Sequence, residues 1–387
     1  MKILFYRYKS ICETDIYNCF LRSGHSVIEM WHDDDESKAI SALSRLLQDN
    51  PCDLIFSINF FPNVSNLCNI YHLRYVCWSV DSPVMELYHH AVSNKWNRLF
   101  LFDRAQYEDI CQFNPENIFH FPLAVDVNSR RNCIDNATPE QINRFTSGLS
   151  FIGSLYTEKN PFDKLTDCSS YLRGYLDGII EAQINTYGYY FVKDCLNPDI
   201  VKMFKDSLPS FFEFPYESYL NNTITLSELY IGNKITAVER TRIAHMLSER
   251  FDFDIYTLSD TTDFPHIHNR GPADSVNEMP IIFNKSQINL NPTCKAIRTG
   301  IPLRVFDTFA SEGFMISNYQ QELCELFVPG EDFIYYSNIG ELPELIEYYL
   351  NHKTECTEIA HNAYKKTKEL YNIDLRLNML LLKAMQV

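Results

Sequence analysis

The chain has 387 residues, 45% of them hydrophobic and 22% charged, with a formal net charge of −16. This length exceeds what one hydrophobic core usually supports, so we expect two domains. The negative charge disfavours binding to nucleic acids or to anionic lipid. No apolar run reaches the roughly 18 residues of a transmembrane helix, and the opening segment turns polar too early for a secretory signal. Twelve scattered cysteines without C-x-x-C pairs predict reduced thiols and a cytoplasmic location.

The first half of the chain alternates short apolar runs with helical patterns. Strands are predicted at 2–6, 25–30, 53–58, 74–78, 98–102 and 117–121, and helices at 15–23, 37–48 and 85–93. Strands that alternate with helices form a parallel, doubly wound α/β sheet. Ligands of such sheets bind at the carboxyl ends of the strands, so we expect functional residues in the loops that follow them.

A polar segment at 128–147 interrupts this pattern, and Thr138 within it has the character of a helix N-cap. We place the connection between the domains here. The second half begins with a strand at 149–153 and a long helical stretch from 161 to 220. Further strands are predicted at 229–231, 254–258, 288–290 and 314–317. Two such domains that face each other form a cleft, which is compatible with a glycosyltransferase, a binding protein or a dehydrogenase.

Two common nucleotide-binding motifs are absent from the sequence. A dinucleotide-binding enzyme carries G-x-G-x-x-G after its first strand, but residues 7–10 read RYKS here. The P-loop pattern is missing as well, and the whole chain has only 12 glycines. The sequence therefore disfavours nicotinamide enzymes and nucleoside triphosphatases.

Motifs in both halves carry a family resemblance. In the second half they are FIGSLYTEKN (151–160), INLNPT (288–293), IRTGIPLRVFDTFASEGFMISN (297–318) and LFVPGEDFIYYSNIGELPELIEYYL (326–350). In the first half they are FSINFFP (56–62), WSVDSP (78–83), FLFDRAQYE (100–108) and FPLAVD (121–126). Their order and spacing resemble glycosyltransferases grouped with the spore-maturation protein family CgeB, related to the retaining glycosyltransferase family 4. The likeness covers nearly the whole chain.

This resemblance implies a GT-B fold, in which two Rossmann-like domains face a cleft. It implies an acceptor-side domain at 1–148 and a donor-binding domain with a helical insertion at 149–369, with a last helix at 370–387 packing back on the first domain. The implied activity is transfer of a sugar from a nucleotide-sugar, with UDP slightly favoured, to a hydroxyl of a glycan, protein or small molecule. The resemblance also implies no cofactor and no metal, and it suggests retention of configuration.

The donor side is expected around the start of a helix near residue 302. Its N–H groups would point into the cleft after Gly300 and offer an anion site for a diphosphate. Arg298 and Arg304 flank this point and can neutralise phosphates. The resemblance places a carboxylate for the ribose hydroxyls at Asp307, where glutamate is usual, although Arg304 and Asp307 also fit a surface ion pair.

A second donor-side loop follows the strand at 149–153. Gly153 lets the backbone approach a diphosphate closely. The resembling family has an arginine next and a lysine a few residues later; here Ser154 replaces the arginine, and Lys159 is either that lysine or a solvated surface residue. The remaining donor-side candidates are Arg270, Asn291 and Thr293.

Asp81, in WSVDSP, is the catalytic candidate. It follows a strand and can orient an acceptor hydroxyl, act as a base or stabilise the positive charge of glycosyl transfer; the alternative is an N-cap for the helix at 85–93. Tyr8, Lys9 and Asn59 are expected on the acceptor side, although a turn explains Asn59 equally well. The scattered histidines lack a third ligand, so no metal site is predicted.

A second function remains open, namely a non-catalytic GT-B-like binding or assembly factor for spore or cell-surface structures. Two departures from the family pattern favour it: Ser154 replaces an arginine, and near Asp81 the histidine of the related family's His-Asp pair is missing. The intact set of residues between 298 and 307 argues against it.

Overall fold

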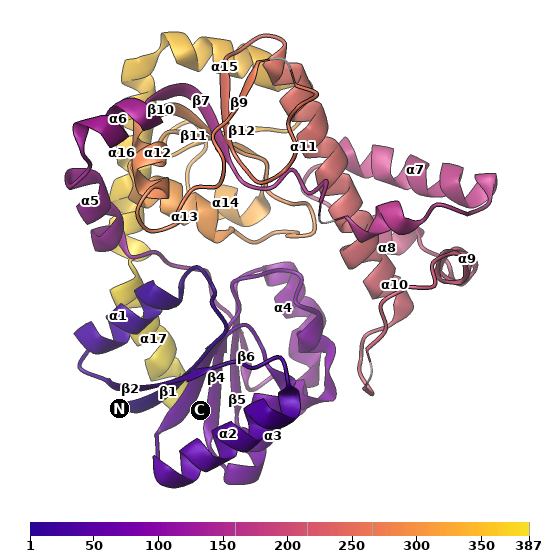
Figure 1. Cartoon of the computed structure of the whole chain (residues 1–387), viewed down its shortest axis with the longest axis vertical. Helices are drawn as coiled ribbons and strands as arrows, with labels where there is room; N and C mark the ends of the chain where they lie inside the picture. The colour runs from indigo at the N-terminus through magenta and orange to yellow at the C-terminus, as the bar shows by residue number, and fades with distance from the viewer. Residues whose placement is uncertain (159, 215, 265, 387) are drawn as a thin grey trace.

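The computed structural model describes residues 1–158, 160–214, 216–264 and 266–386. The structure contains two separate six-stranded sheets, each flanked by helices (Figure 1). A helical arm projects to one side of the molecule. Every strand pair within these two sheets is parallel. The prediction of two doubly wound α/β domains is therefore confirmed.

The sheet of the N-terminal domain has the order β2-β1-β3-β4-β5-β6. Its strands are β1 (Lys2–Arg7), β2 (Ser26–Trp31), β3 (Leu54–Ile58), β4 (Arg74–Trp78), β5 (Asn97–Leu101) and β6 (Ile118–His120). Its helices are α1 (Glu13–Arg22), α2 (Glu36–Asp49), α3 (Pro62–Tyr71) and α4 (Arg104–Ile110), with short 3-10 turns η1 (Met85–Tyr88), η2 (His90–Ser93) and η3 (Cys111–Phe113). The central strands β3 and β5 are buried along their whole length, as expected of a parallel sheet covered on both faces.

The sheet of the C-terminal domain has the order β12-β11-β10-β7-β8-β9. Its strands are β7 (Ser147–Ile152), β8 (Phe253–Tyr256), β9 (Ile267–Asn269), β10 (Ser286–Asn291), β11 (Met315–Asn318) and β12 (Ile334–Tyr336). The helices around it are α11 (Gly232–Ser248), α12 (Met279–Lys285), α13 (Leu303–Ala310), α14 (Gln321–Leu326), η6 (Ile339–Glu341), α15 (Leu342–Asn351) and α16 (Lys353–Leu370).

The insertion between β7 and α11 differs from its sequence-based prediction. Instead of one long helical stretch from 161 to 220 it contains η4 (Pro161–Lys164), α7 (Ser170–Ile184), α8 (Val192–Cys195) and α9 (Pro198–Ser207), then α10 (Asn222–Ile224) and a π-helical turn η5 (Thr225–Ile231). The predicted strand at 229–231 was wrong, because it lies in that π-helical turn. Short apolar runs do not distinguish a strand from a buried helix, and this one packs into the insertion's own core.

The polar connection at 128–147 is also helical. It forms α5 (Val127–Asp135) and α6 (Pro139–Phe145). Thr138 is the N-cap of α6, and its side chain forms a capping box with Gln141. The polarity that suggested an interdomain connection reflects the exposed faces of two short helices.

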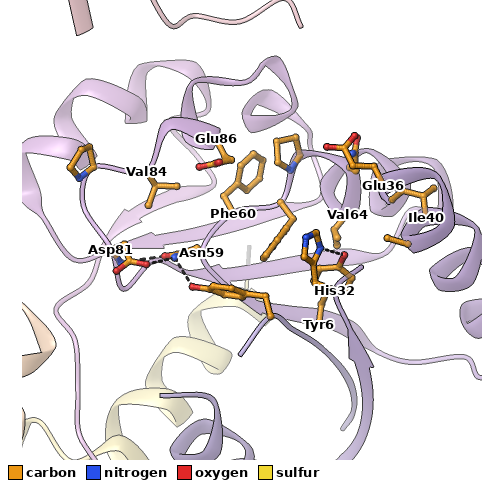
Figure 2. A pocket seen from close by; sticks show the side chains of 16 residues that line it. Tyr6, His32, Glu36, Ile40, Asn59, Phe60, Val64, Asp81, Val84 and Glu86 are labelled. Carbon is orange, nitrogen blue, oxygen red and sulfur yellow. Dashed lines mark hydrogen bonds between the residues drawn. The ribbon is translucent and has the colours of Figure 1, made fainter. Parts of the chain in front are cut away.

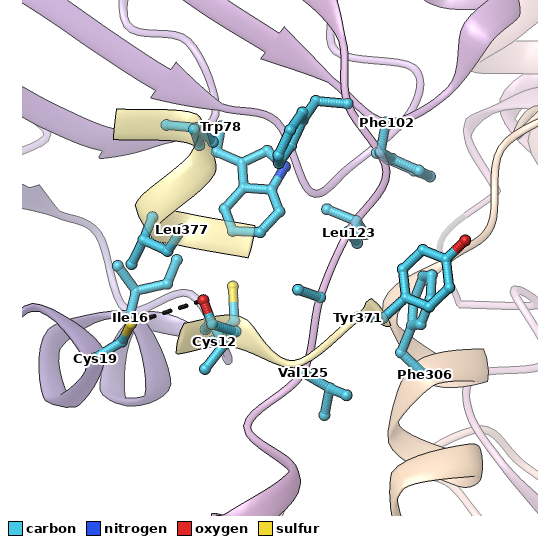
Figure 3. Close-up of a cluster of buried hydrophobic side chains, with 14 of the residues drawn as sticks. Cys12, Ile16, Cys19, Trp78, Phe102, Leu123, Val125, Phe306, Tyr371 and Leu377 are labelled. Carbon is cyan, nitrogen blue, oxygen red and sulfur yellow. Dashed lines mark hydrogen bonds between the residues drawn. The ribbon is translucent and has the colours of Figure 1, made fainter. Parts of the chain in front are cut away.

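The last helix, α17 (Ile373–Gln386), lies against α1 of the N-terminal domain. Asp374 forms an ion pair with Arg22 of α1 at 2.7 Å, and the backbone N–H of Ile373 donates to the carbonyl of Val125 at 2.9 Å. Leu377 belongs to a hydrophobic cluster that joins both domains, and Figure 3 shows Trp78, Leu377, Tyr371 and Phe306 within it. One core therefore runs through the interface.

Two further properties complete the description. All twelve cysteines carry free thiols. None of the helices in the described parts of the chain has the length and hydropathy of a membrane span.

Candidate active site

The carboxyl ends of both sheets open into a cavity of about 480 Å³ between the domains, here called the interdomain cavity. The N-terminal domain contributes the loops after β1 and β4, and the C-terminal domain contributes the loops after β7 and β10, the start of α13 and one side chain of α11. The lining residues are Tyr8, Lys9, Ser10, Ile11, Val80, Asp81, Ser82, Phe151, Ile152, Gly153, Ser154, Tyr156, Arg240, Asn291, Thr293, Cys294, Ile297, Pro302, Leu303 and Arg304. Eight of the predicted site residues are thus brought together.

The loop after β7 begins with Gly153, a position that has no room for a side chain. Its φ is +154°, and an added Cβ would lie 2.9 Å from the ring of Phe151. The carbonyl of Ser154 accepts a hydrogen bond of 2.6 Å from Arg240, whose other guanidinium nitrogens donate to the carbonyl of Pro292 at 3.1 and 2.7 Å. Arg240 therefore bridges the loops after β7 and β10 and adds a positive charge to the cavity wall.

The N-terminus of α13 meets the same wall. Pro302 occupies its N-cap and has no side-chain acceptor, so the positive end of the helix is open to the cavity. Arg304 donates to the carbonyl of Ile152. Burial lowers the pKa of Arg304 to about 10; the charge of Asp307 opposes this effect and that of Arg240 reinforces it. Because Asp307 only partly offsets the cost of burying the Arg304 charge, a bound anion would stabilise the charged guanidinium.

Asn291 and Thr293 are buried supports of the loop after β10. The Asn291 side chain donates to the hydroxyls of Thr293 and Ser317, both at 3.0 Å, and the Thr293 N–H donates to the side chain of Asn318 at 2.9 Å. These bonds fix the backbone between β10 and the cavity.

On the opposite wall, Asn59 ties together three strand ends. Its side-chain nitrogen donates to the Tyr8 hydroxyl at 2.7 Å and to the Asp81 carboxylate at 2.6 Å, and its oxygen accepts from the Val80 N–H at 3.0 Å. Asn59 and Lys9 have positive φ values of 55° and 71°, a conformation that asparagine tolerates well. Burial raises the pKa of the Tyr8 hydroxyl, and the Asp81 charge adds to the effect, so this hydroxyl remains a hydrogen-bond donor.

The alternative role of Asp81 as a helix cap is contradicted. The predicted helix at 85–93 consists of two 3-10 turns, and the residue at the N-cap of η1 is Val84. Asp81 is exposed, and its carboxylate faces the interdomain cavity and the Asn59 amide.

Two of the predicted donor residues lie in the domain interface instead of the cavity. The Arg298 guanidinium forms an ion pair of 2.8 Å with Asp109. The backbone N–H groups of Arg298, Thr299 and Gly300 donate to the carboxylate of Asp103, at 3.1 to 3.2 Å. A Cβ at Gly300 would lie only 2.7 Å from the Cα of Asp103, so this glycine permits close domain contact and not ligand approach.

Asp307 and Arg270 are also held elsewhere. Asp307 is buried and pairs with Arg130 of α5 at 3.0 Å, and not at the surface with Arg304. Arg270 follows the edge strand β9 and pairs with Asp254 at 2.9 Å. Lys159 lies outside the described residues.

Sequence reasoning missed Arg240 and Tyr156, which line the donor wall. Arg240 comes from the middle of α11, more than 80 residues from Ser154, and no local motif marks it. Tyr156 has a φ of +65° and lies 5.1 Å from the Arg240 guanidinium. Within the described residues no group of three or more His, Cys, Asp or Glu side chains has the arrangement of a metal site.

Comparison with solved structures identifies the fold class: the chain has the GT-B fold of two Rossmann-like domains around a cleft. Anabaena HepE in complex with UDP-glucose matches with a TM-score of 0.55 at 11% identity, covering 100% of both chains. Sucrose-phosphate synthase from Thermosynechococcus elongatus matches with a TM-score of 0.55 at 9% identity, covering 100% of this chain and 99% of that one. A glycosyltransferase from Rickettsia africae matches with a TM-score of 0.53 at 10% identity, covering 100% and 98%.

At the level of sequence, residues 240–381 match a family model described as "Glycosyl transferase-like". No curated protein matches the chain. The matched segment begins at Arg240, includes β10 and α13 and ends within α17, and so contains much of the donor wall.

Proposed function

We propose that the chain is a glycosyltransferase that moves a sugar from a nucleoside diphosphate donor, with UDP slightly favoured, to a hydroxyl of an acceptor. The observation that carries the proposal is the interdomain cavity, where Arg240, Arg304 and the α13 N-terminus lie across from Asp81 and Tyr8. The glycosyl transferase-like match at 240–381 and the UDP-glucose complex of a protein with the same fold support it.

In the proposed complex the diphosphate lies on the C-terminal wall. The α13 N-terminus and the two arginines face it, and the Gly153 backbone allows close approach. These groups supply positive charge where negative charge develops on the leaving group. We therefore propose that transfer needs no divalent metal.

In the proposed reaction the acceptor oxygen forms a bond to C1 of the sugar. The bond between C1 and the diphosphate oxygen breaks, and its electron pair leaves with the nucleoside diphosphate. The proton of the acceptor hydroxyl passes to the Asp81 carboxylate, which also opposes the positive charge on the sugar ring. Retention of configuration is proposed from the sequence resemblance to CgeB-type and family 4 transferases, and it requires the acceptor oxygen to attack C1 from the face that the diphosphate leaves; the anomeric NMR signal of the product would test it.

The experiment is a screen of UDP-, GDP- and ADP-sugars by thermal shift, followed by donor hydrolysis and transfer assays with and without EDTA. A donor at 100 times its dissociation constant raises the free energy of unfolding by about 2.7 kcal/mol. We expect one UDP-sugar to stabilise the chain and to be hydrolysed slowly without acceptor, at the same rate in EDTA. Stabilisation by none of them would contradict the proposal, and binding without hydrolysis or transfer would favour the non-catalytic alternative.

A further inference from the structure

A second cavity, here called the N-terminal pocket, lies wholly within the N-terminal domain and has a volume of about 460 Å³. It is bounded by the end of β1, the start of α2, the start of α3 and the loop at 81–86. Figure 2 shows Asp81 and Asn59 at one end of it, and Glu36 and Ile40 at the other. Such a volume suits a small molecule.

The walls of the N-terminal pocket are mainly aromatic and aliphatic. The ring of Phe61 lies 5.0 Å from that of Tyr6, 5.5 Å from that of Tyr8 and 5.3 Å from that of His32, measured between centroids. These rings pack against one another at steep or tilted angles and present edges and faces to the cavity. A sugar ring, with hydroxyls around its edge, would bury less apolar surface against these walls than an aromatic ring does. The walls therefore favour a flat, apolar ligand.

The charged side chains that line the N-terminal pocket are mainly negative. The described residues that line it include the carboxylates Glu36, Asp81 and Glu86 and the imidazole of His32, and none of these described residues is a Lys or Arg. Glu36 also accepts a hydrogen bond of 2.9 Å from Tyr216, a residue of the helical insertion. A phosphate or carboxylate on the ligand would be repelled by three negative charges, whereas an ammonium group would be attracted.

The N-terminal pocket and the interdomain cavity are adjacent and share part of a wall. Tyr8 and Asp81 line both. A hydroxyl at the Asp81 end of a molecule in the pocket therefore points toward the place where the proposed donor presents its sugar. This shared wall distinguishes the N-terminal pocket from an isolated cavity of similar size.

We propose that the N-terminal pocket is the acceptor subsite and that it takes an aromatic hydroxyl compound that is neutral or cationic, while it excludes anionic acceptors and bare sugars. This inference rests on the proposed glycosyltransferase function. In this proposal the aromatic rings around Phe61 bind the body of the acceptor, and the carboxylates select against negatively charged acceptors. Asp81 contacts the hydroxyl that reacts.

Three phenols of nearly the same shape test this inference: tyramine, 4-ethylphenol and 4-hydroxyphenylacetate, with methyl glucoside as the sugar probe. Each is titrated calorimetrically into the full chain without donor. We expect tyramine and 4-ethylphenol to bind, and 4-hydroxyphenylacetate and methyl glucoside to bind at least about tenfold more weakly, given the charge and desolvation terms. Binding of the anion or the glucoside as tight as that of tyramine would overturn the inference.

Variants locate the binding. Ile40→Trp places a bulky ring at the Glu36 end of the pocket, and we expect it to weaken 4-ethylphenol binding at least about tenfold. The double variant Glu36→Gln and Glu86→Gln should reduce the preference for tyramine over 4-hydroxyphenylacetate at least about fivefold. Glu116→Gln, at an exposed carboxylate away from the pocket, is the matched control and should keep the preference. Melting temperatures show that each variant is folded.

UDP is titrated into the same samples to separate the two proposals. UDP binding without binding of any phenol overturns the acceptor assignment and leaves the glycosyltransferase proposal standing. Phenol binding in the expected order without binding of UDP or any other nucleotide overturns the proposed function, and with it the assignment of the pocket as an acceptor subsite.

Discussion

At the scale of single residues, the walls of the two cavities contain three residues with a left-handed backbone conformation. Lys9, Asn59 and Tyr156 all have positive φ, and all three line one of the cavities. Such conformations are uncommon for residues other than glycine and persist only where surrounding contacts impose them. At Asn59 those contacts are the hydrogen bonds to Tyr8 and Asp81. The same bonds that hold this backbone conformation therefore also position the Tyr8 and Asp81 side chains.

The first prediction concerns Asp81. We expect Asp81→Asn to lower sugar transfer by about 10²–10⁴-fold, because the amide cannot take a proton or oppose positive charge. The UDP dissociation constant should be unchanged, since the carboxylate lies on the wall opposite the arginines. The amide oxygen can still accept the hydrogen bond from Asn59, so the melting temperature is the control for folding. Turnover close to that of the unaltered protein would rule out catalysis by this group.

The second prediction compares two arginines of the C-terminal domain. Arg304→Ala should weaken UDP binding by about 1.5–3 kcal/mol, the value of a hydrogen bond to a charged group. Arg270→Ala is the matched control, because Arg270 pairs with Asp254 at the edge of the sheet and does not line the cavity. Calorimetric titration of UDP measures both. Equal affinities in the two variants would show that the diphosphate does not bind at the α13 N-terminus.

At the scale of elements, the sequence predicted the strands well and the short helices poorly. Buried parallel strands are compact apolar runs between turns, which a pattern can find. The π-helical turn η5 and the 3-10 turns η1 and η2 have no such periodic signature. Arg240 was missed for a related reason: its role depends on where α11 passes the ends of β7 and β10, which no local pattern reports.

The π-helical turn η5 carries the third prediction. Burial raises the pKa of Glu228 from its ordinary value to about 7, with Arg298 opposing and Asp109 reinforcing the effect. An acid with a raised pKa contributes stability that is complete below about pH 4.5 and is lost as the pH rises to about 7. Glu228→Gln mimics the uncharged acid. We expect it to raise the free energy of unfolding by roughly 2–3 kcal/mol at pH 8.

The measurement is the melting temperature of both proteins at pH 4.5 and pH 8. The difference should be small at the lower pH, where Glu228 is itself protonated. A stabilisation of the same size at both values would show that the substitution acts through packing and not through charge.

At the scale of the whole molecule, the family resemblance led to the two domains and the cleft, but not to the contacts that hold the domains together. Arg298, Gly300 and Asp307 were expected to face a ligand, and the structure uses them to join the domains. Binding a ligand and joining two domains both require polar side chains near the end of a parallel sheet. A sequence motif shows that such side chains are present. Whether they bind a ligand or join the domains depends on the positions of Asp103 and Arg130, which the motif does not report.

The last prediction tests that interface at its most buried ion pair. Arg130 of α5 lies between Asp15 of α1, at 2.7 Å, and Asp307 of α13, at 3.0 Å, and all three side chains are at least 93% buried. Arg130→Met would leave two buried carboxylates without a cation, and we expect a loss of about 3–5 kcal/mol. Arg131→Met is the matched control on the same helix, because Arg131 pairs at the surface and such pairs contribute about 0–1 kcal/mol.

The pH dependence identifies the cause of that loss. Burial already raises the pKa of Asp15, with the Arg130 charge opposing, so removing Arg130 raises it further. The loss in Arg130→Met should therefore be smallest in acid, where Asp15 is protonated, and should grow as the pH rises toward neutrality. Adding Asp15→Asn and Asp307→Asn removes the unpaired charges and should restore most of the stability at neutral pH. Equal, pH-independent losses in Arg130→Met and Arg131→Met would show that the buried pair does not hold the domains together.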